Sequence, residues 1–572
     1  MADVHADGGP LLHVPDDLTI EQFILCGQHP VKPRWYDQRP VLIDEETGRE
    51  VGSDELRART HGLANALKSR WNIGRLSCIF SPNHIGTILA VQKLGGIVST
   101  ANPAYTAEEL VYQLRLIRAR ILIVHPWVLP VALEAARTYG ITPDRIILFD
   151  PVAGSSFDNI QDLVKLGLGQ VQQFTPLRLS PGDAKKKLAL LSFSSGTTGK
   201  PKAVMITHYS IIANLVQIVQ YLDLNNESVP IERKMYRPGS VSLAIVPFYH
   251  AYGMHMLLFG NMVLKSTIVV SAKFSLERML RSIQQYRVTH LCIVPPQVLL
   301  LCKSPMVKNY DLSSVYFLMS GAAPLSAELQ EQLVRTFPNC IIGQGYAGMT
   351  EIATGVTHIP HDRKVATPGS AGVLLPGFIA RVVKPDGSLA GYNERGELHL
   401  NTPSRSLGYL NNPAATAETY YDGWIRTGDE VILTARKELF IIDRIKELLK
   451  VRGFQVAPSE LEGHLLDHPD VADVCVVGVP DEFSGELPFA FVVLAQGAQA
   501  RVQGDPHERS RSKEMLLKHV ADHKTAYKRL AGIEFVDAIP KNPSGKLLRR
   551  VLRERARAMV ARGQLDVLRS KL

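Results

Sequence analysis

The 572-residue chain is about four times as long as an ordinary domain of ~150 residues, so we expect at least two large lobes with sizeable cores. Hydrophobic residues make up 45% of the chain and charged residues 21%, and the mean hydropathy is +0.01, a balance that excludes overall disorder and collagen-like repeats. The net charge of +9 is concentrated near the C-terminus. The last 72 residues hold 18 Lys and Arg against 8 Asp and Glu, whereas the first 500 hold 46 Lys and Arg against 47 Asp and Glu. This distribution excludes a nucleic-acid-coating surface spread over the chain.

Helical and strand patterns alternate through most of the chain. Residues 54–71 have the spacing of an amphipathic helix, with Leu56, Leu63 and Leu67 on one side, and 76–81 follows as a strand. Similar pairs of a helix and a short strand recur at 110–119 with 121–124, at 276–286 with 290–294, and at 325–337 with 340–343. This alternation predicts α/β layers with largely parallel sheets.

A second unit is predicted to begin near Asp443. Strand and helix patterns recur at 438–442, 458–466, 471–479 and 489–494, and the preceding stretch 369–391 has the glycines of tight β-turns. We therefore predict an α/β fold class with a large N-terminal domain over 1–443, made of layered αβ subdomains and a β-barrel-like subdomain. This domain is predicted to be hinged to a small α+β C-terminal domain over 444–572.

A polar loop after the apolar strand 188–193 is the first motif that suggests a chemistry. Its residues are Ser194, Ser195, Gly196, Thr197, Thr198, Gly199, Lys200, Pro201 and Lys202. Glycines let backbone N–H groups converge on an anion, the hydroxyls add donors and the lysines supply charge, so the loop is predicted to hold phosphate. It is not a Walker A loop, because Pro201 stands where that motif needs Ser or Thr. A surface turn rich in small polar residues is the alternative.

This loop, with Ala-Val-Met-Ile-Thr-His after it at 203–208, closely resembles the signature of the adenylate-forming superfamily, which includes acyl-CoA synthetases, nonribosomal adenylation domains and firefly-type luciferases. Other stretches resemble the same family in the same order. They are Val-Pro-Phe-Tyr-His at 246–250, Gly-Gln-Gly-Tyr-Ala-Gly-Met-Thr-Glu at 343–351, Gly-Trp-Ile-Arg-Thr-Gly-Asp at 423–429, the segment 443–458, and Pro-Lys-Asn-Pro-Ser-Gly-Lys at 540–546. Within the family, 453–462 is most similar to the 4-coumarate:CoA ligase and luciferase branch.

The resemblance implies a reaction in two halves. A carboxylate attacks the α-phosphate of ATP to give acyl-AMP and pyrophosphate, and the thiol of coenzyme A then displaces AMP. The resemblance implies that the 194–202 loop cradles the β- and γ-phosphates, that Thr350 contacts the α-phosphate, and that Glu351 helps hold Mg²⁺, which prefers oxygen ligands. It also implies that Asp429 and Arg444 contact the ribose.

The C-terminal lysines take their roles from the same resemblance. Lys546 matches the lysine that brings an ammonium group to the charge developing at the α-phosphate and carboxylate, before the small domain rotates and removes it. Lys446 matches the hinge, and Lys450 and Gln455 match residues that reach the active site from the small domain. A solvated surface lysine is the alternative for Lys450.

The acyl pocket is also assigned by resemblance. Tyr249 and His250 match residues at the mouth of the pocket, near the reacting carboxylate, and a buried core histidine is the alternative for His250. Gly321 and Ala322 match a turn that flanks adenine and the acyl group, where glycine permits close backbone approach. The full set of presumed pocket residues is Tyr249, His250, Met254, Gly321, Gly348 and Thr354.

Two positions depart from the family pattern. The family usually has Tyr-Gly-Met-Thr-Glu, whereas this chain has Tyr346-Ala347-Gly348 before Met-Thr-Glu, one residue more. Either Tyr346 still stacks on adenine across a bulged turn, or Ala347 takes its place and the stacking is lost. Val451 and Arg452 replace the usual Tyr and Lys, a change expected to affect contacts with CoA.

An ATP-dependent acyl-CoA ligase acting on an aryl or a medium-to-long acyl acid is the leading hypothesis. One alternative is a luciferase-like oxidase of an adenylated acid, which shares every motif. Another is a stand-alone adenylating enzyme, which would load a carrier protein. A catalytically dead nucleotide-binding or interaction protein is the alternative from another class. The chain retains Glu351, Asp429, Arg444 and Lys546, which argues against a catalytically dead protein.

The cysteines and the two ends of the chain indicate the cellular compartment. The six cysteines lie far apart, which favours a reduced compartment, and no apolar run approaches the ~18 residues of a membrane span. The N-terminus has no secretory signal. The chain ends in Ser570-Lys571-Leu572, a tripeptide that the peroxisomal import receptor recognises, so a peroxisomal location is expected. No nucleic-acid partner is expected.

Overall fold

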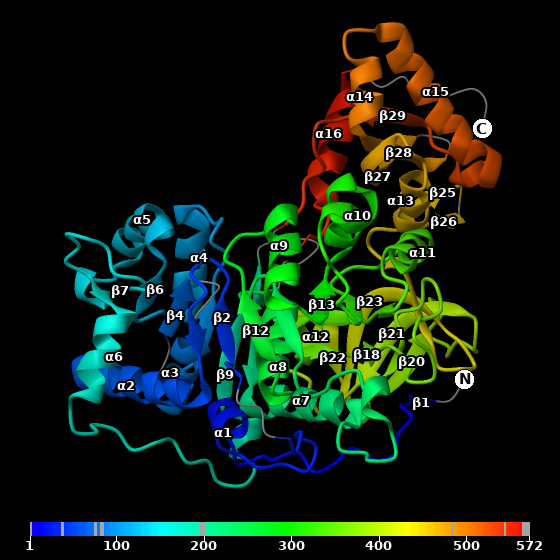
Figure 1. Ribbon diagram of the computed structural model, residues 1–572. Coiled ribbons are helices and arrows are strands. Elements are labelled where there is room, and N and C mark those ends of the chain that lie inside the picture. The colour runs from blue at the N-terminus through cyan, green and yellow to red at the C-terminus, as the bar shows by residue number, and fades with distance from the viewer. Residues whose placement is uncertain are drawn as a thin grey trace.

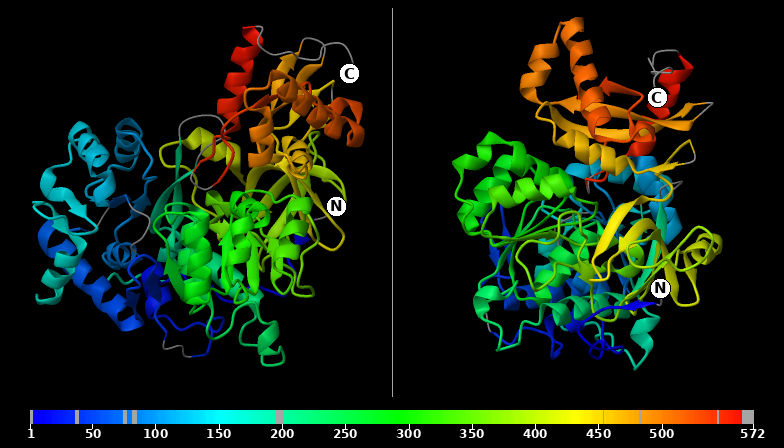
Figure 2. Two further views of the ribbon diagram at one scale, coloured as in Figure 1. Left: turned by 45° about the horizontal axis from the view of Figure 1, so that its top comes forward. Right: turned by 90° about the vertical axis from the view of Figure 1, so that its right-hand side faces the viewer.

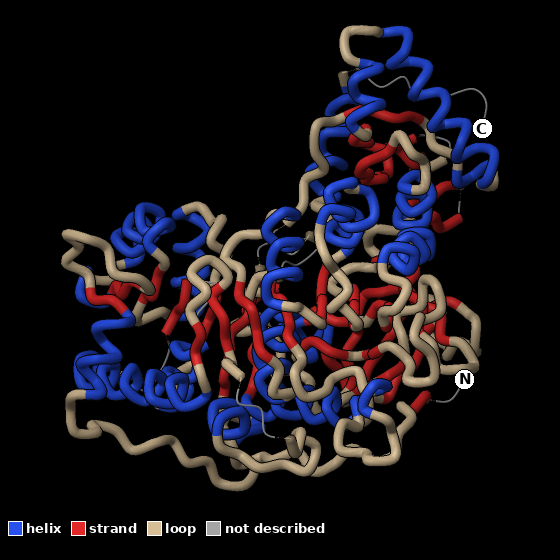
Figure 3. The backbone as a smooth tube through the Cα atoms, in the orientation of Figure 1, coloured by secondary structure: helices blue, strands red, loops and turns tan. Residues whose placement is uncertain are grey.

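The computed structural model describes residues 3–35, 39–73, 77–80, 85–194, 201–452, 454–481, 484–542 and 545–562. These residues form a large lobe and a small lobe, and the small lobe stands on one side of the large one (Figures 1 and 2). In both lobes the strands run through the interior and helices lie outside them (Figure 3). Among the described residues, no helix combines the length and the apolar character needed to cross a bilayer.

A mainly parallel sheet forms the part of the large lobe at the left of Figure 1. Its strand order is β10-β9-β5-β4-β6-β7-β8, and only β9 and β10 pair antiparallel. In β6, Ile123 packs into one hydrophobic cluster and Leu122 and Val124 into another, because successive side chains of a strand point to opposite faces. The strands are β4 Ser77–Phe80, β5 Val98–Thr100, β6 Leu122–Val124, β7 Ile146–Leu148, β8 Asp158–Asn159, β9 Leu188–Ser194 and β10 Lys202–Thr207.

Helices cover both faces of this sheet. Helix α2 packs against α3 and α6 on one side, and α4 packs against α5 on the other (Figure 1). Helix α4 begins at a capping box in which Thr106 accepts from the backbone N–H of Glu109, as its sequence favours. The helices are α2 Ser53–Trp71, α3 Ile85–Lys93, α4 Ala107–Ile117, α5 Leu129–Tyr139 and α6 Ile160–Leu168.

A second sheet has the strand order β15-β14-β13-β11-β12-β2-β3 and is parallel except for the β2–β3 pair. In β14, Leu318 packs into one cluster while Phe317 and Met319 pack into another, so this sheet is also buried on both faces. The strands are β2 Leu42–Asp44, β3 Glu50–Val51, β11 Val241–Ala244, β12 Thr267–Val270, β13 His290–Ile293, β14 Phe317–Ser320 and β15 Ile341–Gln344. Its helices are α1 Ile20–Leu25, α7 His208–Leu222, the π-helix η5 Tyr252–Gly260, α8 Asn261–Val263, α9 Leu276–Tyr286, α10 Pro295–Lys303 and α11 Ala327–Thr336.

An antiparallel sheet forms the third part of the large lobe and corresponds to the predicted β-rich subdomain. Its order is β1-β20-β21-β23-β22, and β24 also pairs with the long strand β23. The elements are β1 Val4–His5, β20 Ile379–Val383, β21 Arg395–Asn401, α12 Pro413–Thr419, β22 Tyr420–Tyr421, β23 Trp424–Leu433 and β24 Leu439–Arg444. Two short ribbons pair β16 Ala347–Met349 with β17 Thr354–Gly355, and β18 Thr357–His358 with β19 Val373–Leu374.

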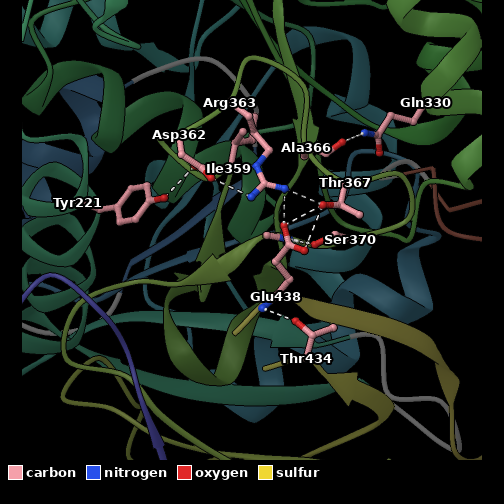
Figure 4. Close-up of polar contacts among 11 residues, drawn as sticks. Tyr221, Gln330, Ile359, Asp362, Arg363, Ala366, Thr367, Ser370, Thr434 and Glu438 are labelled. Carbon is pink, nitrogen blue, oxygen red and sulfur yellow. Dashed lines mark hydrogen bonds and ion pairs between the residues drawn. The ribbon is translucent and has the colours of Figure 1, made fainter. Parts of the chain in front are cut away.

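A buried ionic contact fixes the start of β24 against a loop of the large lobe (Figure 4). Glu438, 5% exposed, accepts from Thr367 Oγ1 at 2.8 Å, and Arg363 Nη1 lies 3.2 Å from its Oε1. Arg363 also pairs with Asp362 at 2.9 Å. These contacts hold β24 to the large lobe.

The small lobe has its own sheet and its own core. Strands β26, β25, β28 and β27 lie in that order and β29 pairs with β28, over a hydrophobic cluster separate from those of the large lobe. The elements are β25 Leu449–Val451, β26 Phe454–Val456, α13 Pro458–Leu466, β27 Val471–Asp481, β28 Gly485–Leu494, α14 Gln496–Val502, α15 Pro506–His523, β29 Gly532–Phe535 and α16 Arg549–Ala561. Short 3₁₀ turns occur at Pro126–Val128, Pro143–Arg145, Asp183–Lys185, Ile231–Arg233, Pro305–Asn309, Thr350–Ile352 and Ala526–Lys528.

The predicted α/β architecture, with a large and a small lobe, is confirmed. One assignment was wrong: the strand predicted at 438–442 as the first of the second unit is β24, which pairs with β23 in the large lobe. The stretch has the apolar pattern of a strand, but that pattern carries no information about which sheet the strand joins. The small lobe's own sheet begins only at β25.

Candidate active site

A cleft of about 910 Å³ lies where the two lobes meet. Its walls come from the ends of β9 and β10, the turn after β14, the β16 ribbon, strands β23 and β24, and the loop that carries Lys546 in the small lobe. The predicted site residues on its surface are Ser194, Lys202, His250, Ala322, Tyr346, Thr350, Glu351, Asp429, Arg444, Lys446 and Lys546. Residues more than 350 positions apart in the chain therefore share one cavity.

The two ends of the predicted phosphate loop face the cleft. Ser194 ends β9 and Lys202 begins β10, and the two residues are paired in the antiparallel register. The Nζ of Lys202 lies 4.8 Å from the centre of the Tyr409 ring, a cation–π arrangement that directs the lysine along the cleft wall. The predicted residues Ser195, Gly196, Thr197, Thr198, Gly199 and Lys200 lie outside the described residues.

Thr350 and Glu351 begin the 3₁₀ turn after β16. Thr350 is 7% exposed. The carboxylate of Glu351 accepts at Oε1 from the hydroxyl of Tyr409 at 2.8 Å, and its backbone carbonyl accepts from the N–H of Ser406 at 2.8 Å. These bonds hold an acidic side chain at the cleft surface, beside the end of the phosphate loop.

Asp429 and Arg444 are cross-strand partners in β23 and β24. Arg444 Nε lies 2.6 Å from Asp429 Oδ1, and the hydroxyl of Tyr346 donates to Asp429 Oδ2. The negative charge of Asp429 raises the pKa of Arg444, and burial raises the pKa of Tyr346. The site therefore brings the carboxyl group of Asp429, a guanidinium and a phenol into contact.

Tyr346, Ala347 and Gly348 lie where the chain has one residue more than the family pattern. In the β16–β17 ribbon, Ala347 pairs with Gly355 and Met349 with Thr354, so the register shifts and Gly348 is accommodated as a bulge. Tyr346 and Ala347 both line the cleft. The Tyr346 ring extends to Asp429, whereas the Ala347 carbonyl accepts from the N–H of Ala322 at 3.0 Å.

Lys546 enters the cleft from the small lobe, and His250 enters from the large one. Burial lowers the pKa of Lys546, and the positive charge of Arg444 acts in the same direction. Burial also lowers the pKa of His250 to about 4, with a further contribution from the charge of Lys546. His250 is therefore a neutral imidazole at pH 7, close enough to Lys546 to sense its charge.

Lys450 and Gln455 are not brought into this cleft. They are cross-strand partners in the β25–β26 hairpin, and both are exposed. Lys446 lies between the lobes, with its side chain 58% exposed and its Nζ 3.7 Å from Glu418. In this arrangement of the lobes Lys546 lines the cleft and Lys450 does not.

The presumed acyl-pocket residues divide into two groups. His250 lines the cleft, and the half-buried Tyr249 adjoins it, its carbonyl accepting from Thr100 Oγ1 at 3.1 Å. Met254 and Thr354 do not reach the cleft surface: Met254 is 1% exposed on η5, and the fully buried Thr354 shares a 2.8 Å hydrogen bond with His255 Nδ1. The sequence could not show this, because the π-helix shifts which residues of η5 share a face, and the Thr354 contact joins residues 99 positions apart.

Gly321 lies behind the cleft surface rather than on it. A Cβ built on Gly321 would come within 2.8 Å of the Tyr252 ring, so the close approach expected for this glycine is to a core aromatic side chain. Ala322, next in the chain, has a positive φ of 66° and lines the cleft.

Sequence reasoning did not identify the buried ion cluster beneath Lys546. Arg549 is 8% exposed and forms two hydrogen bonds to Glu462, at 2.5 and 2.9 Å, and one to Glu447 at 3.0 Å. Glu462 also accepts from the N–H of Val476 at 2.7 Å. Only the position of Arg549, three residues after the predicted catalytic lysine, could have drawn attention to it.

Comparison with known proteins identifies the family of the chain. The sequence profile of the AMP-binding enzyme family matches residues 32–410, and that of the AMP-binding enzyme C-terminal domain matches 460–546. The chain therefore belongs to the AMP-binding enzyme family. Within it, the chain is an AMP-forming acid–thiol ligase of the adenylate-forming class.

Similar proteins include 4-coumarate–CoA ligase 3 of Oryza sativa subsp. japonica, 32% identical, with 96% of this chain and 94% of that protein covered. The probable 4-coumarate–CoA ligase 1 of Dictyostelium discoideum is 38% identical over 83% of each chain. Among solved structures, the anthranilate CoA ligase AuaEII in complex with anthranoyl-AMP has a TM-score of 0.81 at 23% identity, covering 96% of this chain and 99% of that one.

Proposed function

We propose that this enzyme adenylates a carboxylic acid with ATP and then transfers the acyl group to coenzyme A, releasing pyrophosphate and AMP. One observation carries the proposal: Lys546, Thr350 and the Asp429–Arg444 pair line a single cleft between the lobes. The substrate's own carboxylate is the nucleophile, so this chemistry needs no protein nucleophile and depends on positioning and charge.

Each half of the cleft has a proposed role in the first reaction. The 194–202 loop holds the β- and γ-phosphates and Thr350 contacts the α-phosphate. Asp429 accepts the ribose hydroxyls beside Arg444. The Lys546 ammonium neutralises charge that develops between the α-phosphate and the attacking carboxylate, which binds near His250. The neutral state of His250 at pH 7 leaves it as a hydrogen-bond partner that adds no charge.

The donor set at Glu351 fits Mg²⁺. A carboxylate and a nearby threonine hydroxyl are hard oxygen ligands, and Tyr409 engages Oε1 of the carboxylate. Glu351 would hold the ion together with phosphate oxygens. When bound, Mg²⁺ would neutralise charge on the phosphates.

We further propose that the small lobe rotates for the second half-reaction. The lobe boundary is assigned as 1–443 and 444–572, with Lys446 at the hinge, in the short segment between β24 and β25. In the present arrangement Lys546 lines the cleft while Lys450 and Gln455 are exposed outside it, which suits the proposed first half-reaction. Rotation would withdraw Lys546 and bring the β25–β26 hairpin to the thioester-forming site.

The proposed acids are aryl or medium-to-long acyl acids. Support comes from the relatives, which are named for 4-coumarate, and from the structural neighbour named for anthranilate. The test is incubation with ATP, Mg²⁺, CoA and a panel of these acids, read by mass spectrometry. A CoA thioester is expected; light or oxygen uptake would indicate a luciferase-like oxidase, acyl transfer only to a carrier protein would indicate a loading enzyme, and no product with any acid would reject the proposal.

Tyr346 is proposed to stack on adenine across the bulge at Gly348. Tyr346→Phe keeps the aromatic face and should change the KM for ATP little, whereas Tyr346→Ala should raise it roughly 10-fold, because aromatic–base stacking contributes about 1–3 kcal/mol. Steady-state kinetics at varied ATP measure both. Equal KM values for wild type and Tyr346→Ala would show that Tyr346 does not stack on adenine.

A peroxisomal location is also proposed, through recognition of Ser570-Lys571-Leu572 by the import receptor. This tripeptide lies outside the described residues. A fluorescent protein fused in front of this chain's last ten residues should enter peroxisomes, and the same fusion without the final three should not. Identical distributions of the two fusions would overturn the assignment.

A further inference from the structure

Three histidines of the small lobe come together on the side of α13 that faces α15. His464 lies on α13, and His519 and His523 are one helical turn apart on α15, so they share a helix face. One potential ligand nitrogen from each of the three lies within 4.8 Å of those of the other two. Helices α13 and α15 pack side by side in the small lobe (Figure 1).

Each of these rings has one nitrogen bonded to a backbone carbonyl. His464 Nε2 bonds the carbonyl of His519 at 3.1 Å, His519 Nε2 bonds that of His464 at 3.2 Å, and His523 Nδ1 bonds that of His519 at 2.9 Å. A carbonyl only accepts, so these nitrogens carry the protons. The opposite nitrogens, Nδ1 of His464 and His519 and Nε2 of His523, therefore hold lone pairs.

The three rings share one feature with metal-binding histidines. Such a histidine usually donates its other ring N–H to a carbonyl or carboxylate, which fixes the tautomer. Lys524, which follows the cluster, is paired with Glu460 at 3.4 Å, so its charge is partly compensated.

We propose that His464, His519 and His523 form a binding site for a divalent transition-metal ion of the zinc class, separate from the cleft. Imidazole nitrogen suits Zn²⁺, Ni²⁺ and Cu²⁺ and does not suit Mg²⁺. Three protein ligands leave a fourth tetrahedral position for water.

The rings must reorient to bind such an ion. The His464 and His519 rings are stacked, with centroids 4.3 Å apart and planes at 4°, whereas a metal ion lies in the plane of each imidazole that binds it. Zinc–nitrogen bonds of ~2.0–2.1 Å in a tetrahedral site bring the nitrogens to ~3.3 Å from one another. Binding would therefore turn the His464 and His519 rings out of their parallel stack; His523 is exposed and the other two rings are only partly buried.

Binding would join α13 to α15. Helix α13 also contacts the large lobe, because Lys303 Nζ donates to the carbonyl of Leu466 at 3.3 Å and Gly463 lies against Ser326. The ion would therefore stiffen the helix on which the small lobe rests. This site does not depend on the proposed ligase activity.

The test is metal binding by the full chain, purified without a polyhistidine tag and held in excess Mg²⁺. Titration with Zn²⁺ should show one site per chain and raise the melting temperature, and Co²⁺ should give the intense visible absorption of tetrahedral coordination. His519→Ala and His523→Ala should weaken binding at least ~100-fold, since even the loss of an outer-shell partner costs 10–100-fold.

His507→Ala is the matched control, because His507 is exposed and lies on the same helix outside the cluster. It should bind Zn²⁺ like the wild type. His523→Ala removes only an exposed ring, so its metal-free melting temperature should match the wild type and show that a loss of binding is not unfolding. Absence of stoichiometric binding, or equal binding by wild type and His523→Ala, would overturn the proposal.

Discussion

Replacing Lys546 with alanine is expected to abolish acid-dependent exchange of pyrophosphate with ATP, with a loss of at least ~100-fold, the usual cost of removing one charge-stabilising group from a transition state. Lys546 lines the cleft and is partly buried there, and its charge acts on His250, so water screens that charge less than at an open surface. Thioester formation from supplied acyl-AMP should be largely retained, because that step is proposed to use the other face of the small lobe.

The two half-reactions are measured separately, with isotopic exchange for the first and release of AMP from synthetic acyl-AMP and CoA for the second. Lys518→Ala is a suitable control, since Lys518 is an exposed lysine of the same lobe, paired with Asp522 at 2.6 Å. A folded Lys546→Ala protein that loses both half-reactions equally would contradict the assigned role.

Replacing Arg549 with methionine should destabilise the small lobe by about 3–5 kcal/mol, the cost of leaving one partner of a buried ion pair alone. Arg549 is the partner of both Glu462 and Glu447, and methionine in its place has no donor for either carboxylate. Hydrogen exchange of β27 and β28, followed by mass spectrometry, measures the loss in the lobe concerned.

The double variant Arg549→Met, Glu462→Gln supplies the matched comparison. Glutamine keeps an oxygen to accept from Val476 and removes the buried charge, so most of the stability should return. A double variant as unstable as the single one would show that Arg549 acts through packing and not through its charge.

The stability of the Arg549→Met variant should also depend on pH, in a direction set by the pKa of Glu462. Burial raises the pKa of Glu462 to about 7, against the opposing effect of Arg549, whereas the pKa of a glutamate in the unfolded chain is near 4.5. The folded state therefore binds the proton more tightly, and its stability is lost as pH rises from 4.5 through the folded pKa. Without Arg549 the folded pKa rises further, so the protection of β27 and β28 in the single variant, corrected for the pH dependence of intrinsic amide exchange, should be greater at acidic pH.

Much of the fold followed from local patterns. The helices predicted at 276–286 and 458–466 are α9 and α13 with the same bounds, because each combines an apolar face with clear boundary residues. In α9, Ser275 caps the first turn and Arg287 ends the helix in a left-handed conformation. The cleft residues were found because their motifs are contiguous in the chain.

Long-range contacts were not accessible in the same way. The partner sheet of β24, the burial of Met254 and Thr354, and the pairing of Arg549 with Glu462 all depend on residues distant in sequence. His464 and His519 are 55 positions apart, so no spacing rule joins them. The one local indication of the histidine cluster was the i, i+4 spacing of His519 and His523. Such a pair by itself is common on surface helices.

The bulge at Gly348 shows how a chain of this family can carry an extra residue in this motif without displacing the residues that follow. An inserted residue in a regular strand would turn every following side chain to the opposite face. Here the β16–β17 ribbon takes up the extra residue locally, and Thr350 and Glu351 still face the cleft. A length difference within this motif therefore alters the contour of one wall while leaving the spacing of the residues beyond it intact, so a gap in an alignment at this point is not a sign of lost activity.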